Sequence, residues 1–317
     1  MNDVYKIFVT IDSSGYGIIS ISVEAASAPI WSRINSALLS HNFEHTSSGN
    51  SFRLSWPDTL TLVREFGTKS AQKAFGFRLI PSDEATVKLA EFAEQVRSVR
   101  QSRNVAPQNL KSDEELKVEL SELGFVRRTL KDFQIRDLSR LLALANGANF
   151  SVPGAGKTTV TFALHVLFHQ PGQHLLIVAP KAAFQAWKDV VEDCIDPQIS
   201  PSNAETFTLL DGAETQTAAA LNSGATRFII SYDLAIRQQS TISNHLATYP
   251  THLVLDESHR MKAGFASQRG SFLLGVASLP LRRDILSGTP MPQAASDMES
   301  QLEFLWPGQG LGRAISL

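Results

Sequence analysis

The sequence predicts an α/β fold: an open, mainly parallel sheet with helices on both faces over residues 105–317, preceded by a small α+β domain over residues 1–104. Two observations carry the prediction for the larger part. A glycine-rich stretch, Ser151-Val-Pro-Gly-Ala-Gly-Lys-Thr, opens an amphipathic helix over 158–169. Short apolar runs of strand length follow, and one of them ends in the carboxylates Asp256 and Glu257. Such a run places its carboxylates at the carboxyl edge of a parallel sheet, where nucleotides bind.

The first hundred residues differ in kind. Their alternating apolar pattern at 4–11 and 18–23 predicts two strands joined by a hairpin turn. The expected elements that follow are helix 30–39, loop 42–50, strand 51–56, helix 57–66, strand 75–80 and helix 83–100. Ser82 is expected to cap the last helix.

No catalytic constellation is evident in this first domain. His41 and His45 are four residues apart, but no nearby Cys or Glu completes a metal site, so we expect both to be exposed to solvent. The domain is interpreted as a recognition or regulatory module that contacts protein partners or docks on the larger domain.

A polar segment at 101–112 separates the two domains, with the boundary near residue 105. Ser112 then begins a helix whose first turn is acidic. The strands of the larger domain are expected at 174–179, 207–210, 227–231, 252–256 and 283–287.

The glycine-rich stretch is typical of a loop that binds nucleoside phosphates and is expected to follow a helical segment. Backbone N–H groups in such a loop wrap phosphates, and the helix N-terminus behind them carries partial positive charge. Lys157 would reach the β- and γ-phosphates of ATP, and the Thr158 hydroxyl would hold Mg²⁺. The residues expected to contact the nucleotide here are Pro153, Gly154, Ala155, Gly156, Lys157, Thr158 and Thr159. Ser151 stands where such loops usually begin with glycine, and a bland glycine-rich turn is the alternative.

The strand at 252–256 ends in Asp256-Glu-Ser-His. Asp256 is suited to hold Mg²⁺ through water, and Glu257 is suited to orient and deprotonate an attacking water. An acidic helix N-terminus is the alternative, but the order of phosphate loop first and acidic strand end second disfavours it. The hydroxyls of Ser287-Gly-Thr-Pro would lie beside this strand end, unless that segment is an ordinary turn.

These motifs together resemble the first RecA-like lobe of superfamily-two helicase-like ATPases, and most closely the Swi/Snf-type DNA translocases. Gly154-Ala-Gly-Lys-Thr resembles motif I of that family, Asp256-Glu-Ser-His motif II and Ser287-Gly-Thr-Pro motif III. Leu175-Leu-Ile-Val-Ala-Pro-Lys, followed by Trp187, resembles motif Ia, and Leu130-Lys-Asp-Phe-Gln resembles the glutamine motif. The resemblance covers about residues 120–312.

The resemblance implies roles for individual residues. Gln134 would read the adenine, and His259, Ser287 and Thr289 would couple hydrolysis to nucleic-acid grip. The implied nucleic-acid contacts are Lys181, Ser231, Arg260 and Lys262. Two departures weaken the subfamily placement: Phe150-Ser-Val-Pro replaces an acidic pair, and Ser258 replaces Ala or Gly.

Motors of this family use two RecA-like lobes with ATP between them. The sequence ends at Leu317, just past the first lobe, so the resemblance implies a fragment or half of a machine. The second lobe, in a longer chain or another protein, would supply arginine fingers.

Composition bounds the remaining possibilities. With 43% hydrophobic residues and no apolar run near the roughly 18 needed to span a bilayer, the sequence predicts a globular protein without membrane contact. The single cysteine, Cys194, cannot form an internal disulfide, and no secretory signal is evident. We therefore expect a cytoplasmic protein, nucleoid-associated if prokaryotic. The net charge of −2 requires any nucleic-acid site to be a local patch.

Three functions remain open. The first is a DNA-dependent ATPase that translocates on double-stranded DNA. The second is an unwinding helicase on DNA or RNA, and the third is an ATP-gated binding module without turnover. The sequence does not distinguish chromatin-like remodelling, repair, transcription recycling or prokaryotic anti-phage defence.

Overall fold

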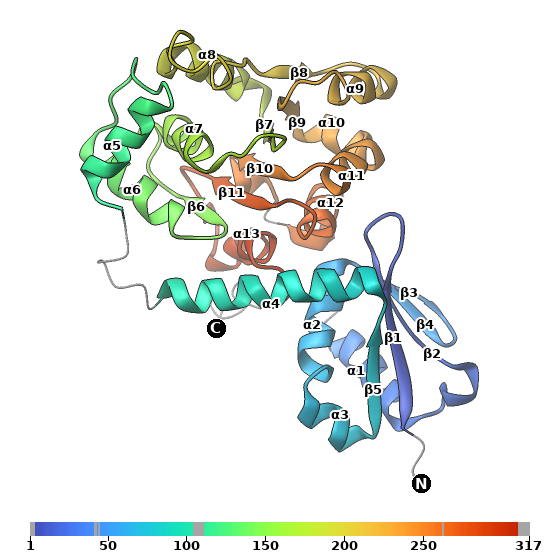
Figure 1. Cartoon of the computed structure of the whole chain (residues 1–317). Helices are drawn as coiled ribbons and strands as arrows, with labels where there is room; N and C mark the ends of the chain where they lie inside the picture. Colours follow the sequence, from blue (N-terminus) through green and yellow to red (C-terminus); the bar gives the residue numbers. More distant parts are fainter. Residues whose placement is uncertain (1–3, 41–42, 44, 104–110, 262, 310–317) are drawn as a thin grey trace.

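The structure is a computed structural model that describes residues 4–40, 43, 45–103, 111–261 and 263–309 (Figure 1). It contains a five-stranded mixed sheet followed by a six-stranded sheet. None of the described helices has the length and apolar character needed to cross a bilayer.

The first sheet has the strand order β3-β4-β2-β1-β5. Its strands are β1 (Tyr5–Ile11), β2 (Gly17–Ile21), β3 (His45–Ser48), β4 (Ser51–Leu54) and β5 (Phe77–Pro81). The helices of this domain are η1 (Val23–Ala25), α1 (Pro29–Ser40), α2 (Trp56–Phe66), α3 (Lys69–Phe75) and α4 (Asp83–Arg103). Side chains of β1, β2, β4 and β5 on one face form a core with α1, α2 and the start of α4.

Most predicted elements of this domain are confirmed within two residues, including the Ser82 cap, whose Oγ accepts from Ala85 N at 3.2 Å. The loop predicted over 42–50 is wrong for 45–48, which form β3 and pair with β4. This strand is polar and has no apolar alternation that would announce it. His45 is half-buried rather than exposed, and its Nδ1 lies 2.9 Å from Phe43 O; His41 is outside the described residues.

Helix α3 was also not predicted, and it includes Phe75, which was expected to begin a strand. Its ends carry their own signals: the Thr68 hydroxyl accepts from Ala71 N at 3.2 Å, and Gly76 stops the helix with φ of 65°.

The second sheet has the order β6-β11-β10-β7-β9-β8, and all its neighbouring strands are parallel. Its strands are β6 (Gly147–Asn149), β7 (His174–Ala179), β8 (Thr208–Leu210), β9 (Arg227–Ser231), β10 (Thr251–Asp256) and β11 (Arg282–Leu286). The predicted parallel α/β lobe is confirmed, and its five predicted strands occur within a residue of their expected positions.

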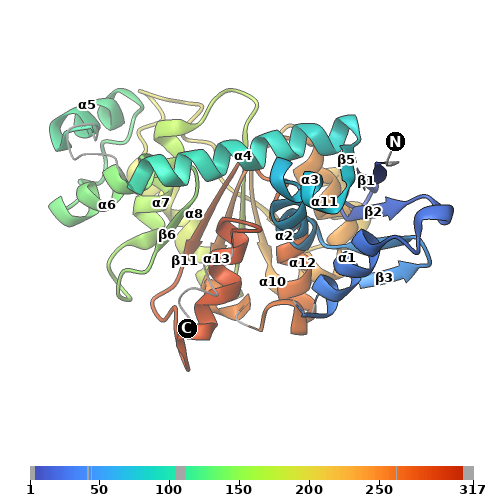
Figure 2. The same ribbon diagram turned by 90° about the horizontal axis from the view of Figure 1, so that it is seen from below.

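Helices cover both faces of this sheet (Figures 1 and 2). One layer comprises α5 (Asp113–Glu122), α6 (Asp132–Leu142), α7 (Lys157–Phe168) and α8 (Phe184–Cys194). The other comprises α9 (Glu214–Leu221), α10 (Tyr232–Arg237), α11 (Gln239–Thr248), α12 (Gln268–Val276) and α13 (Glu299–Leu305). Short 3₁₀ turns lie at η3 (Lys181–Ala183), η4 (Ser258–Met261), η5 (Gly264–Ala266) and η6 (Ala295–Met298).

The central strands are buried on both faces. In β7, Leu175 and Ile177 belong to one core, whereas Leu176 and Val178 belong to the other. Burial on both faces explains why these strands read as continuous apolar runs.

Strand β6 was not predicted. Because it lies between α6 and the glycine-rich loop, the expectation that the loop follows a helical segment is wrong. Its three residues, Gly-Ala-Asn, have little strand propensity, and the strand exists because it pairs with β11. At Gly147 a Cβ would lie 2.5 Å from Asp284 Oδ1, so the close approach of the two strands requires glycine.

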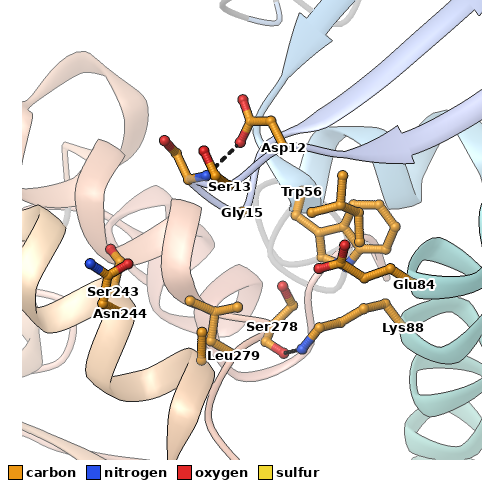
Figure 3. A pocket seen from close by; sticks show the side chains of 13 residues that line it. Asp12, Ser13, Gly15, Trp56, Glu84, Lys88, Ser243, Asn244, Ser278 and Leu279 are labelled. Carbon is orange, nitrogen blue, oxygen red and sulfur yellow. Dashed lines mark hydrogen bonds between the residues drawn. The ribbon is translucent and has the colours of Figure 1, made fainter.

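The two domains touch along α4, α2 and the β1–β2 hairpin (Figures 1 and 2). Lys88 on α4 donates to the Ser278 carbonyl at 3.3 Å, and Gly15 at the hairpin tip lies against Leu279. Figure 3 shows a cavity of about 360 Å³ at this junction, between Trp56 and Glu84 of the first domain and Asn244 and Leu279 of the second.

Candidate functional site

The glycine-rich loop lies between β6 and α7, at the carboxyl edge of the parallel sheet. Gly154 and Gly156 have φ of 80° and 81°, a left-handed backbone that glycine adopts without strain. Among the described residues, nothing lies within 4 Å of a Cβ placed on Gly154, so the backbone there is open to a ligand. Lys157 Nζ donates to the carbonyls of Ser151 at 2.9 Å and Val152 at 3.3 Å, which holds its ammonium over the loop. This cradle fits the phosphates of a nucleotide.

Gln134 on α6 braces the loop from behind. Its Nε2 donates to the Ala155 carbonyl at 2.8 Å, and its Oε1 accepts from Lys131 N at 2.9 Å. A Cβ on Gly156 would lie 2.4 Å from Gln134 Nε2, so this side chain and the loop are in direct contact. In this structure both polar ends of the Gln134 amide are bonded to protein atoms.

Thr159 also lies behind the loop. It is buried, and its hydroxyl accepts from Arg128 Nη1 at 3.1 Å. The more accessible members of the predicted set are therefore Pro153, Gly154, Ala155, Gly156, Lys157 and Thr158.

Asp256 ends β10 and is only 8% exposed. Its Oδ2 accepts from the fully buried Trp187 indole Nε1 at 2.9 Å, and its Oδ1 accepts from Glu257 N at 2.9 Å. Burial raises the pKa of this carboxyl, although the Trp187 hydrogen bond and the positive charge of Lys157 oppose the shift. Carboxylate oxygens are ligands that Mg²⁺ prefers, and Asp256 lies near enough to Lys157 for the positive charge of that lysine to act on it.

Glu257 has φ of 53° and is the one residue other than glycine with positive φ among those described. Such a conformation costs on the order of 1–3 kcal/mol and persists where the surroundings impose it. Its side chain is 40% exposed, in contrast to that of its neighbour Asp256. The turn therefore separates a buried carboxylate from an accessible one in consecutive positions.

His259 connects this strand end to the next. Its Nδ1 lies 3.1 Å from Ser287 Oγ and 3.4 Å from Glu257 Oε2. Ser287 Oγ also accepts from Thr289 N at 3.1 Å, which orders the turn after β11. A Cβ on Gly288 would lie 2.9 Å from Pro153 Cγ, so this turn packs directly on the phosphate loop. The three predicted motifs thus meet in one contiguous group.

The predicted nucleic-acid contacts follow the ends of β7, β9 and β10. These three strands are consecutive in the sheet, in the order β10-β7-β9. Lys181 and Arg260 are exposed. Ser231 is 8% exposed and its Oγ caps α10 by accepting from Leu234 N at 3.3 Å, which leaves little of it for a ligand. Lys262 lies outside the described residues.

Two supporting residues escaped the sequence analysis. Trp187 was noted only as part of a motif, yet its N–H orients Asp256. Tyr232 is buried and donates its hydroxyl to the Asp256 carbonyl at 2.8 Å. Burial, together with the negative charge of Asp256, raises the pKa of Tyr232 well above its usual value. The hydroxyl therefore stays neutral and remains a donor. A buried aromatic with a polar tip is a signal for such a role, but sequence does not show its target.

A parallel sheet whose carboxyl edge brings together a phosphate loop, an Asp-Glu strand end and a Ser-Gly-Thr turn defines a helicase-like P-loop ATPase domain. The chain belongs to the SNF2-related domain family, whose sequence model matches residues 138–310, more than half of the 317 residues.

Individual relatives agree with this assignment. The chain is 29% identical over 190 residues to the probable ATP-dependent DNA helicase CHR23 of Arabidopsis thaliana, covering 56% of this chain and 17% of CHR23. It is 28% identical over 161 residues to the human DNA annealing helicase and endonuclease ZRANB3, covering 50% and 14% of the two chains. It is 28% identical over 207 residues to helicase SWR1 of Candida albicans, covering 61% and 12%. The chain therefore spans less than a fifth of the length of these relatives.

Two solved structures are also similar. The UvsW helicase of bacteriophage T4 aligns with a TM-score of 0.45 at 15% identity, over 95% of this chain and 97% of UvsW. A hypothetical ATP-dependent RNA helicase of Sulfolobus tokodaii aligns with a TM-score of 0.43 at 16% identity, over 61% and 55% of the two chains.

Proposed function

We propose that this chain binds ATP with Mg²⁺ and is the first motor lobe of an ATPase that double-stranded DNA stimulates and that translocates on duplex DNA. The observation that supports this most is the meeting of Lys157, Asp256 and Glu257 at one edge of the sheet, with His259 linking them to Ser287.

In this proposal the loop N–H groups and Lys157 bind the phosphates, and Thr158 and Asp256 hold the metal. Bound Mg²⁺ would neutralise charge on the phosphate oxygens. Glu257, accessible and close to His259, orients a water for in-line attack on the γ-phosphate and accepts its proton. Because His259 contacts both Glu257 and Ser287, a change at the γ-phosphate would reach the turn at 287–290.

Nucleic-acid contact is assigned to Lys181 and Arg260, which are exposed beside the nucleotide edge. Cations placed so contact the phosphodiester backbone without reading sequence. The remaining half of the ATP site, including arginine fingers, is assigned to a second RecA-like lobe in a longer chain or a partner protein.

Two substitutions test the nucleotide site. Lys157→Ala should weaken ATP binding or turnover at least about 100-fold, because it removes the cation that faces the phosphates. Glu257→Gln should retain ATP binding but slow turnover at least about 100-fold. The matched controls Lys188→Ala and Glu122→Gln change exposed residues elsewhere on the lobe and should leave both quantities unchanged. Unchanged turnover in the Lys157 variant would refute the phosphate-loop assignment.

The nucleic-acid partner is tested by measuring ATP turnover of this chain, and of any longer natural form that carries it, with duplex DNA, single-stranded DNA and RNA. Stimulation by duplex DNA supports the translocase. Stimulation by single strands or RNA alone would favour an unwinding helicase, and ATP binding without response to any nucleic acid would favour an ATP-gated binding module.

A further inference from the structure

The sheet of the N-terminal domain has one face that none of the described helices covers. The core residues Ile7 and Val9 of β1 point to the helical side, and Lys6, Phe8 and Thr10 alternate with them on the other. Figures 1 and 2 show α1, α2 and α3 gathered on the helical side of the sheet. We call the other side the open face; the register places on it Lys6, Phe8, Ile18, Arg53, Arg78 and Ile80. Its remaining strand positions, such as Ser20 and Thr46, carry hydroxyl side chains.

The open face is basic. Lys6 of β1 and Arg78 of β5 are exposed and stand directly opposite each other in the register. Like charges in directly opposite positions repel, and an anion bound between them would relieve this repulsion. No strand position on this face among the described residues is acidic; Asp12, just beyond β1, is paired with Arg53 at 2.6 Å. This local excess of positive charge occurs in a chain of net charge −2.

An aromatic ring lies between the basic positions. Phe8 is on β1 with neighbours on both sides, Ser20 of β2 and Ile80 of β5, yet it is 39% exposed. An exposed phenyl ring on a flat sheet is a stacking surface for an unpaired base, and hydroxyls and cations around it suit sugars and phosphates.

Arg53 extends this surface toward the motor lobe. Its guanidinium carbon lies 3.8 Å from the centre of the Tyr16 ring, and its Nε donates to Asp12 Oδ2 at 2.6 Å. Arg53 also lines a cleft of about 620 Å³ between the domains, together with Arg237 and Gln239 of the lobe. None of the described residues that line this cleft is acidic. The cleft lies beside the smaller cavity of Figure 3, with which it shares Ser13 and Asn244.

We propose that the open face, continued through Arg53 into the interdomain cleft, binds single-stranded nucleic acid. Lys6, Arg78 and Arg53 contact phosphates, and Phe8 stacks on a base. A duplex would meet the same cations, but its bases are stacked on each other and would not use Phe8. This site needs no ATP and is separate from the nucleotide edge, so it stands or falls independently of the proposed ATPase.

The test is the affinity of the whole chain for a fluorescently labelled 20-nucleotide single strand, measured by anisotropy without ATP over a series of salt concentrations. Phe8→Ala should weaken binding at least about 5-fold, since the loss of stacking on one base weakens binding by about 5- to 150-fold. The double variant Lys6→Gln/Arg78→Gln should weaken binding and lower the slope of log K against log salt by about 1.4, the value for two phosphate contacts on a single strand.

The matched control is Lys69→Gln/Lys73→Gln, which removes the same charge from exposed α3 on the helical side of the sheet. It should leave the affinity within about twofold of the parent. Because all these side chains are at least partly exposed, each variant should keep the melting temperature of the parent, which checks folding separately. Lys157→Ala should bind the single strand normally even if it has lost ATP turnover.

Three results would overturn the proposal. One is equal loss of affinity in the test and control doubles, which would indicate a general charge effect. Another is unchanged single-strand binding in Phe8→Ala together with weakened duplex binding in the double variant, which would indicate a duplex surface without stacking. The third concerns polyglutamate, used as an acidic peptide probe. If Lys6→Gln/Arg78→Gln loses binding to polyglutamate but keeps its affinity for the oligonucleotide, the partner would be an acidic peptide.

Discussion

The carboxyl and amino edges of the parallel sheet carry the same kinds of side chain, but these side chains differ in exposure and in role. His252 is the second residue of β10, which ends at Asp256 and is followed by His259; Asp284 is the third residue of β11, which is followed by Ser287. At the carboxyl edge, the His259 side chain is 28% exposed and beside an accessible carboxylate. At the amino edge, the His252 side chain is 1% exposed and Asp284 3%. Burial, rather than residue type, therefore distinguishes the His259–Glu257 pair of the carboxyl edge from the His252–Asp284 pair of the amino edge.

The amino edge is a closed hydrogen-bond network. Arg282 donates to both oxygens of Asp284, at 2.6 Å and 3.2 Å, and to the carbonyls of Leu141 and Leu144. His252 Nε2 lies 2.8 Å from Asp284 Oδ2, and its Nδ1 lies 3.3 Å from His165 Nδ1. Burial alone would raise the pKa of Asp284, but Arg282 and His252 outweigh it and lower that pKa. With Asp284 ionised, His252 donates through Nε2 and accepts from His165, which fixes the tautomers of both rings.

The largest difference between the edges is expected in stability. Asp284→Ala should lower the free energy of unfolding by about 3–5 kcal/mol, because it leaves the buried Arg282 without its counter-charge. Asp256→Ala at the other edge should cost less, about 1–2 kcal/mol, because burial already disfavours its charged form and the main loss is the partner of the buried Trp187 N–H. Urea unfolding of both variants at pH 7.5 measures this. Equal losses would show that the two edges are not different in kind.

The difference between the edges also marks what the sequence could predict. The carboxyl edge was predictable because its motifs are local: each is a few consecutive residues after a strand, and parallel strands end at one edge. Lys157, Asp256, Glu257 and Ser287 are brought together as that logic requires, although their chemical roles remain proposals.

The amino-edge network was not predictable, because its members come from residues 165, 252, 282 and 284, whose meeting depends on the strand order. Strand β6 was not predictable for the same reason. It forms by pairing with β11, and Asp284 of β11 lies so close to Gly147 that only glycine fits there. In the N-terminal domain, β3 was missed because polar Ser and Thr residues give no periodic signal. Trp187 was visible in sequence, but its hydrogen bond to Asp256 spans 69 residues.

The buried histidines predict acid sensitivity. His245 lies against His174, with Nε2 and Nδ1 3.2 Å apart, and burial first and His174 second lower the pKa of His245 to about 4. Burial also lowers the pKa of His165 and His252. A histidine with a depressed folded-state pKa binds its proton more tightly when unfolded. Stability should therefore be complete above about pH 6.5 and fall as the pH drops from 6.5 toward 4.

His245 alone should contribute about 2 kcal/mol of this loss, after allowance for its partial exposure. The measurement is urea unfolding at pH 7.5 and pH 4.5 for the parent, for His245→Phe and for the control His45→Gln on β3. The His245 variant should lose less stability on acidification than the parent, and the His45 variant should match the parent. A parent whose stability is flat between these two pH values would contradict the assignment of neutral, buried rings to the amino edge.

The smallest expected effect concerns Trp187, where a buried side chain serves the reactive edge. Trp187→Phe keeps an aromatic ring in the core but removes the N–H that holds Asp256 Oδ2. If Asp256 holds the metal, losing this support should weaken Mg²⁺-dependent ATP binding about 10-fold, while binding of ATP in the presence of a chelator stays unchanged. Trp306→Phe is the matched control, because the Trp306 indole N–H is buried without a hydrogen-bond partner among the described residues. Equal changes in the two variants would mean that Trp187 acts through packing, and that the buried side of the reactive edge is as purely structural as the opposite edge.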